Sequence, residues 1–107
     1  MNIEYSEHLH YKLLTLTGEV DLSNSSEVRK CLLEILASGQ SIIVDFSKLD
    51  YIDSSGMATL VEGLNVAKKN ELQLLISSAK GAPKQVLELT RLDQVFTIVA
   101  SLSEIKD

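Results

Sequence analysis

Apolar and polar positions along the chain follow two spacings, and each spacing predicts a different secondary structure. Apolar residues alternate with polar ones around residues 11–17, which is typical of a half-buried strand, and this run stops at Gly18. A weaker strand at residues 3–6 is expected to pair with it through a turn near residues 7–10. Short apolar runs predict three more strands. These runs are residues 42–46, 72–76 and 96–99.

Helical spacing predicts two long helices between these strands. The first stripe has Asn24 and Glu27 at capping-box spacing before it and Gly39 after it. The second stripe begins at Met57 and predicts a helix that continues to about Asn70. The apolar members of the two stripes are Val28, Cys31, Leu32, Ile35 and Leu36, and then Met57, Leu60, Val61, Leu64 and Ala67.

Two shorter helices are expected in the last third of the chain. Pro83 suits the first turn of a helix with Val86, Leu87 and Thr90 on its inner side, and Ser101 and Glu104 have capping spacing for a short terminal helix. Strands separated by helices need crossover connections, so the sheet should be largely parallel with an antiparallel hairpin at the N-terminus. The pattern therefore predicts an α/β fold.

Length and composition favour one domain over residues 1–107. The chain has 107 residues, of which 45% are hydrophobic, and this is enough for a single core without a disulfide or a metal. No apolar run approaches the roughly 20 residues that cross a bilayer, so we expect no membrane insertion. Residues 1–7 lack the basic and apolar regions of a signal peptide, and we expect a cytoplasmic protein.

The charge argues against one class of partner. The formal net charge is −5 and the sequence pI is about 4.9, whereas nonspecific nucleic-acid binding needs a basic surface, so we expect no direct nucleic-acid partner. The single cysteine, Cys31, lies in the apolar stripe of a helix and is interpreted as a small core residue, because no second cysteine is available for a disulfide or a CxxC pair.

The junction at residues 50–57 is the best candidate for a functional site. Asp53, Ser54 and Ser55 stand between a predicted strand and a predicted helix. The first backbone N–H groups of a helix lack partners within the helix, and the positive end of the helix dipole lies there, so an oxygen or a phosphate is favoured. Helix capping by Ser54 is the alternative interpretation from the motif alone.

Enzymatic chemistry finds little support in the sequence. A hydrolase would need a histidine beside Ser54, but His8 and His10 lie together in the N-terminal turn, and the order Asp-Ser-Ser-Gly differs from a GxSxG elbow. No dinucleotide or P-loop motif is present. Asp45, Asp50 and Asp53 could collect a cation, although turn and capping roles are the simpler interpretation. We therefore expect a protein that is not an enzyme and has no metal site.

Four segments resemble the STAS domain family, specifically the bacterial anti-sigma factor antagonists. They are TGEVD at 17–21, VDFS at 44–47, IDSSG at 52–56 and LELTRL at 87–92, the last followed by Val95 and Phe96. The resemblance runs almost from end to end. It implies a STAS-like fold, with a central mixed sheet of four to five strands, helices on one side and about four helices in total.

The resemblance also implies a function. Such antagonists bind an anti-sigma factor that is itself a serine kinase, which phosphorylates them with its own ATP, and a PP2C-type serine phosphatase resets them. On this pattern the acceptor is the residue after the motif aspartate, Ser54, with Ser55 as the alternative. No cofactor is implied for this chain. Single STAS domains also serve as accessory subunits of phospholipid transport complexes or in stress-signalling assemblies, which leaves constitutive docking as the alternative function.

Four residues around the acceptor are expected to support partner binding. Asp53 either aligns the acceptor or favours the helix start, and Ser55 is a capping or first-turn residue. We expect Gly56 to keep the surface open for a partner, and the alternative is a plain turn glycine. Asp21 is expected either to join the partner-binding face or to be a solvated acid in the turn. A phosphate on Ser54 is expected to be held by the N–H groups of Gly56 and Met57 and to repel an acidic partner surface.

Overall fold

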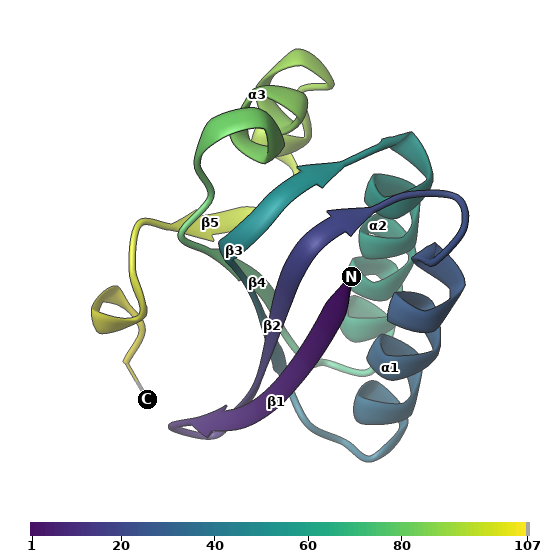
Figure 1. The fold of residues 1–107 in the computed structure, drawn as a ribbon. Coiled ribbons are helices and arrows are strands. Elements are labelled where there is room, and N and C mark those ends of the chain that lie inside the picture. The colour runs from purple at the N-terminus through teal and green to yellow at the C-terminus, as the bar shows by residue number, and fades with distance from the viewer. Residues whose placement is uncertain (107) are drawn as a thin grey trace.

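The strands form one five-stranded sheet in which they lie side by side in chain order, β1-β2-β3-β4-β5 (Figure 1). The computed structural model describes residues 1–106, and Asp107, the last residue of the expected domain, lies outside the described residues. The strands are β1 Asn2–His8, β2 Tyr11–Val20, β3 Ile42–Ile52, β4 Leu74–Ser77 and β5 Thr97–Val99. The helices are α1 Ser25–Ala37, α2 Ser54–Lys69 and α3 Gly81–Leu89, with short 3-10 turns η1 Leu92–Gln94 and η2 Leu102–Glu104.

The sheet is mixed, as expected. β1 pairs with β2 in an antiparallel hairpin, with Tyr5 opposite Leu14, whereas β2 to β5 pair in parallel. The carboxyl ends of the four parallel strands therefore meet at one edge of the sheet. The α/β class and the STAS-like sheet are confirmed. Residues 1–106 contain three α-helices and two 3-10 turns where about four helices were expected, because the terminal helix is only the turn η2.

One large core lies between the sheet and the helices. α1 and α2 run side by side along one face, and Figure 1 shows α3 across the end of the sheet near β3 and β5. An exposed ion pair joins α1 to α2, with 2.8 Å between Nη2 of Arg29 and Oε2 of Glu62. The innermost side chains are wholly buried, and they come from both layers. They include Leu14, Leu16, Val44, Phe46 and Ile52 from the sheet and Leu32, Leu60 and Leu87 from the helices.

The opposite face of the sheet is covered in part by the C-terminal segment. A second apolar cluster there joins Tyr11, Leu13, Ile43 and Leu75 to Ile105, which is buried. The turn η2 positions this segment, and the N–H of Ser101 donates to the Glu104 carboxylate at 3.1 Å. The capping spacing of Ser101 and Glu104 is thus confirmed, and it brings an isoleucine back onto the sheet.

β3 is longer than the sequence predicts, and this extension positions the candidate site. The apolar run ends at Phe46, but the strand continues to Ile52, with Thr17 opposite Lys48 and Val20 opposite Ile52. Pairing with β2 extends β3 although polar residues interrupt its apolar pattern. The irregularities in register between these two strands accompany the longer pairing.

The capping box predicted for α1 is wrong. Asn24 occupies the N-cap position, but its side chain makes no capping hydrogen bond to the helix. Its Oδ1 instead accepts from the N–H of Asp21 at 2.9 Å, and its Nδ2 donates to the Glu19 carbonyl at 3.0 Å. Asn24 therefore holds the turn that leaves β2, a role that its spacing to Glu27 does not reveal.

Replacing Ile105 by alanine tests how much the second apolar cluster contributes to stability. We expect Ile105→Ala to lower the free energy of unfolding by about 2 kcal/mol, because it removes a buried side chain from the apolar cluster on the face of the sheet opposite α1 and α2. Urea denaturation measures this change. The exposed neighbour provides the control, since Lys106→Ala should change stability by less than about 0.5 kcal/mol. Equal effects of the two variants would contradict the packing role of Ile105.

Candidate functional site

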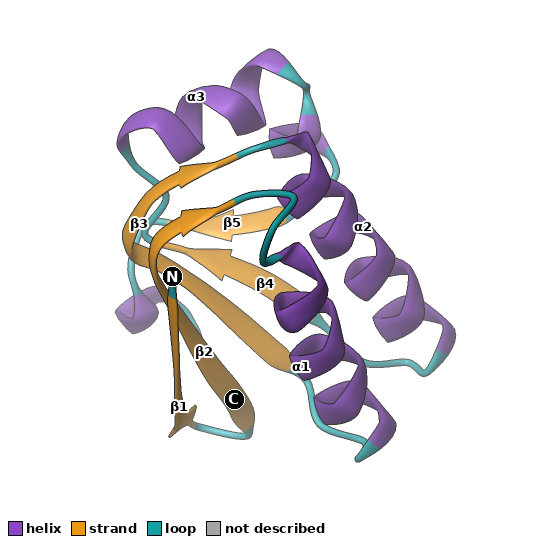
Figure 2. Cartoon of the chain, turned by 45° about the vertical axis from the view of Figure 1, so that its right-hand side comes forward, coloured by secondary structure: helices purple, strands orange, loops and turns teal. Residues whose placement is uncertain are grey.

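The candidate site lies where β2 and β3 end next to each other. Val20 is opposite Ile52 in the ladder, and the N–H of Asp53 donates to the Val20 carbonyl at 3.0 Å. The chain then leaves β2 through the loop to α1 and leaves β3 directly into α2. Figure 2 shows this loop passing beside the first turns of α2. Asp21 and Asp53 are therefore brought to the same edge of the sheet.

Asp53 is the N-cap of α2. Its Oδ1 accepts from the hydroxyl of Ser55 at 2.6 Å and from the N–H of Gly56 at 3.0 Å. These bonds, first that of the Ser55 hydroxyl and then that of the Gly56 N–H, hold the pKa of Asp53 below its usual range, with smaller contributions from the N–H groups of Ser55 and Leu22. The carboxylate of Asp53 thus organises the first turn of α2.

Ser54 is the first residue of α2 and is exposed. Within residues 1–106 its hydroxyl makes no hydrogen bond, because Asp53 has taken the capping position. The interpretation of Ser54 as the helix cap is therefore wrong. Its side chain is left facing solvent, directly after the capping carboxylate.

Ser55 differs from Ser54 although the two are adjacent and chemically identical. It is half-buried, and its hydroxyl donates to the Asp53 carboxylate at 2.6 Å. The expectation of a first-turn role for Ser55 is confirmed. Modification of this hydroxyl would remove a hydrogen bond that stabilises the helix start, whereas modification of Ser54 would remove none.

Gly56 does not keep the surface open, because it is buried beneath the site. A Cβ at this position would lie 2.6 Å from Cγ1 of Ile52 and 2.9 Å from Cγ1 of Val20. Both neighbours are wholly buried β-branched residues with restricted rotamers. The expectation of an open surface is wrong, and the glycine instead lets α2 start against the ends of β2 and β3.

Asp21 takes part in a local turn on the neighbouring loop. Its carboxylate accepts from the N–H of Ser23 at 2.9 Å and from the Ser23 hydroxyl at 2.5 Å. The next residue, Leu22, is 81% exposed. Leu22 was not among the predicted site residues, although a leucine within a turn of Asp, Ser and Asn is a signal that could have identified it.

The expected phosphate cradle is already occupied. The N–H of Gly56 donates to the Asp53 carboxylate, and the N–H of Met57 donates to the Asp53 carbonyl at 3.0 Å. These are the two groups that the sequence led us to assign to a phosphate. A phosphate on Ser54 would therefore have to project toward solvent or displace the cap, and projection breaks no bond of the folded protein.

The structure separates the groups that other chemistries would require. His8 ends β1 and His10 lies in the hairpin turn, while Ser54 follows the far end of β3. β2 spans this separation with 10 residues, or roughly 30 Å at about 3.3 Å per residue. Asp45, Asp50 and Asp53 form no group that could hold a metal ion in the part of the chain that the structure describes. Within the same residues, no helix is both long and apolar enough to cross a membrane.

Comparisons with known proteins identify relatives of this fold. A family model described as STAS domain matches residues 2–105. A structure from Thermotoga maritima, named as a candidate anti-sigma factor antagonist, is 23% identical, covers 95% of this chain and 89% of its own, and has a TM-score of 0.87. An anti-sigma factor antagonist from Mycobacterium paratuberculosis is 17% identical, with coverages of 96% and 88% and a TM-score of 0.82. The Bacillus cell fate determinant SpoIIAA in its phosphorylated form is 17% identical, with coverages of 96% and 95% and a TM-score of 0.74.

Replacing Asp53 by asparagine tests the capping carboxylate through pH. A carboxyl with a lowered pKa in the folded state adds stability above its unfolded pKa of about 3.9 and loses it as the pH falls toward the folded value. Asn also caps helices but does not titrate in this range. We expect wild type to exceed Asp53→Asn in stability at neutral pH and to lose this advantage below about pH 4. Urea denaturation across pH measures the difference, and a difference that does not change with pH would contradict the assignment.

Two glycine variants of α2 test the close approach at Gly56. We expect Gly56→Ala to lower the free energy of unfolding by about 1–3 kcal/mol, because the new methyl group meets two rigid buried side chains. Gly63→Ala is the matched control in the same helix. A Cβ there would meet only the Cδ1 atoms of Leu32 and Leu74, at 3.1 Å, and the substitution gains about 1 kcal/mol of helix propensity. Thermal and urea denaturation should show the larger loss at position 56, and the reverse order would contradict the packing role.

Proposed function

The chain belongs to the STAS domain family, and from this membership we propose that it is an anti-sigma factor antagonist switched by phosphorylation of Ser54. In its unphosphorylated form it binds an anti-sigma factor serine kinase in the cytoplasm. That kinase uses its own ATP to phosphorylate Ser54, and the modified protein is released. A PP2C-type serine phosphatase restores the binding form.

The single observation that carries the proposal is the difference between the two serines. The Ser54 hydroxyl is exposed and makes no hydrogen bond within residues 1–106, whereas the Ser55 hydroxyl is held by the Asp53 carboxylate. A kinase must reach the acceptor oxygen, and only at Ser54 is it free. Family membership and the DSSG order favour the same residue.

Phosphorylation would act through charge at this position. A phosphate adds about −1.5 to −2 charges, next to the carboxylate of Asp53 and on the same edge as Asp21. The exposed side chain of Leu22 stands on the same loop as Asp21 and would lie within a contact that a partner makes over this edge. Desolvating a dianion in such a contact is costly, so a partner that binds over Ser54 would be released.

The fold can carry this charge without rearrangement. Each hydrogen bond at the start of α2 is made by Asp53 with Ser55, Gly56, Met57 or Val20, and none uses the Ser54 side chain. The phosphorylated SpoIIAA structure has the same fold as this chain, with a TM-score of 0.74, which supports a switch that leaves the architecture intact.

Phosphorylation with the partner kinase and ATP tests the acceptor directly. Both serines lie in the tryptic peptide 49–68, and fragmentation of this peptide by mass spectrometry separates the two sites. We expect phosphate on Ser54, none in Ser54→Ala, and a wild-type amount in the matched control Ser55→Ala. Phosphate on Ser55 alone, or on neither serine, would rule out Ser54 as the acceptor.

The same variants separate the switch from constitutive docking onto a transport or stress-signalling complex. Ser54→Asp introduces part of the phosphate charge and should weaken binding to the kinase at least about tenfold, with an unchanged circular dichroism spectrum. Ser55→Ala should bind as wild type does. Wild-type binding by Ser54→Asp, together with recovery on transporter subunits, would support docking instead.

A further inference from the structure

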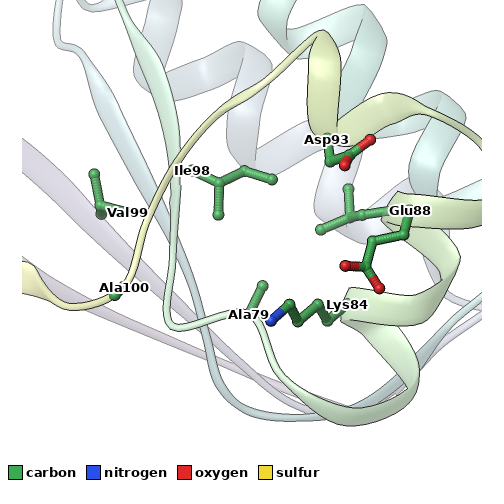
Figure 3. A pocket seen from close by; sticks show the side chains of 8 residues that line it. Ala79, Lys84, Glu88, Asp93, Ile98, Val99 and Ala100 are labelled. Atoms are coloured by element: carbon green, nitrogen blue, oxygen red, sulfur yellow. The ribbon is translucent and has the colours of Figure 1, made fainter.

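A cavity away from Ser54 opens at the carboxyl ends of β4 and β5. It has a volume of about 270 Å³ and lies between these ends and α3. Ala79 follows β4, and Val99 and Ala100 stand at the end of β5. Ile98 forms much of the apolar part of the wall (Figure 3), and Leu87 from α3 lies behind it.

Charges of both signs stand around this apolar wall. Lys84 and Glu88 come from α3 and Asp93 comes from η1, and all three line the cavity. Lys84 and Glu88 are one helical turn apart, a spacing at which opposite charges commonly pair. Within the described residues, however, none of the three forms an ion pair or a side-chain hydrogen bond. An ammonium and two carboxylates are thus presented to the cavity without neutralising one another.

We propose that this cavity binds a small zwitterion with an aliphatic body, of the class of the branched-chain α-amino acids. The aliphatic group would pack against Ile98 and Ala79, above the buried Leu87, the ligand's ammonium would lie at Glu88 and Asp93, and its carboxylate would lie at Lys84. At about 30 Å³ per water molecule, the cavity has room for on the order of ten non-hydrogen atoms, which is the size of leucine. Burial of the apolar part and two charge-assisted contacts together provide recognition.

The charge pattern favours a free amino acid over the alternatives. A purely anionic ligand would leave Glu88 and Asp93 facing its negative charge, and a purely cationic ligand would leave Lys84 facing its positive charge. An internal leucine of a partner peptide would fill the apolar part but would satisfy neither charge, because its backbone amine and carboxyl groups are in peptide bonds. The zwitterion satisfies both.

Titration with four related compounds tests the proposal. L-leucine, isopentylamine, 4-methylpentanoate and N-acetyl-leucine amide share one aliphatic body. Isopentylamine lacks the carboxylate, 4-methylpentanoate lacks the ammonium, and N-acetyl-leucine amide has both charged groups blocked. In ¹H–¹⁵N NMR spectra of the full chain, leucine should shift the amides of Ala79, Ile98 and Ala100, and each of the other three should bind at least about tenfold more weakly. The absence of shifts with roughly 10 mM leucine would overturn the proposal. Equal binding of N-acetyl-leucine amide would also overturn it and would assign the cavity to a peptide side chain.

Two charge variants with matched controls locate the contacts. Lys84→Met should weaken leucine binding about tenfold and leave isopentylamine binding unchanged, because isopentylamine has no carboxylate. Glu88→Gln should weaken the binding of leucine and of isopentylamine, because both compounds carry the ammonium group. Lys80→Met and Glu71→Gln change exposed residues that do not line the cavity, and they should bind leucine as wild type does. All four positions are exposed, so folding should be preserved. Equal effects of Lys84→Met and Lys80→Met would overturn the assignment of Lys84.

Discussion

The carboxylate of Asp53 is the interaction on which the candidate site depends. It accepts hydrogen bonds from the Ser55 hydroxyl and from the Gly56 N–H, and so caps α2. These bonds are the main causes of its lowered pKa, to which the Leu22 N–H on the neighbouring loop adds the smallest contribution. The backbone N–H of the same residue bonds to the last residue of β2. One residue therefore fixes both ends of the junction: its backbone N–H pairs with the end of β2, and its side chain starts α2. Ser54 is exposed and unbonded as a consequence, because its neighbour already performs the capping that a serine would otherwise perform.

Close packing below the surface gives this arrangement a rigid base. Gly56 brings the start of α2 so near to Val20 and Ile52 that no side chain fits between them. These two residues end adjacent parallel strands and belong to the main core. The site is thus exposed on its outer side and tightly packed on its inner side. Such a site can gain a surface charge while its backbone stays in place, which is the property that a binding surface controlled by phosphorylation needs.

Local patterns predicted most of the fold and the position of the serines. The alternation around Leu14 and Leu16, the helical stripe from Val28 to Leu36 and the strand-to-helix change at Asp53 each depend on residues close in sequence. What the sequence did not reveal depends on tertiary partners. The last residues of β3 are strand because β2 lies beside them. Gly56 is buried because two strand ends meet it, and Asn24 bonds back to Glu19 rather than forward to its helix. The hydroxyls of Ser54 and Ser55 differ only because one of them reaches Asp53.

Backbone amide NMR of the protein before and after stoichiometric phosphorylation of Ser54 tests the central claim most directly. A local electrostatic switch on a rigid base predicts shifts confined to the residues around the junction, in the loop that contains Asp21 and Leu22 and in the first turn of α2. The amides of β4, of the second half of α2 and of the C-terminal segment should keep their shifts and their hydrogen-exchange protection. Widespread shifts across the sheet, or loss of protection in α2, would show that phosphorylation acts by changing the fold and would contradict the account.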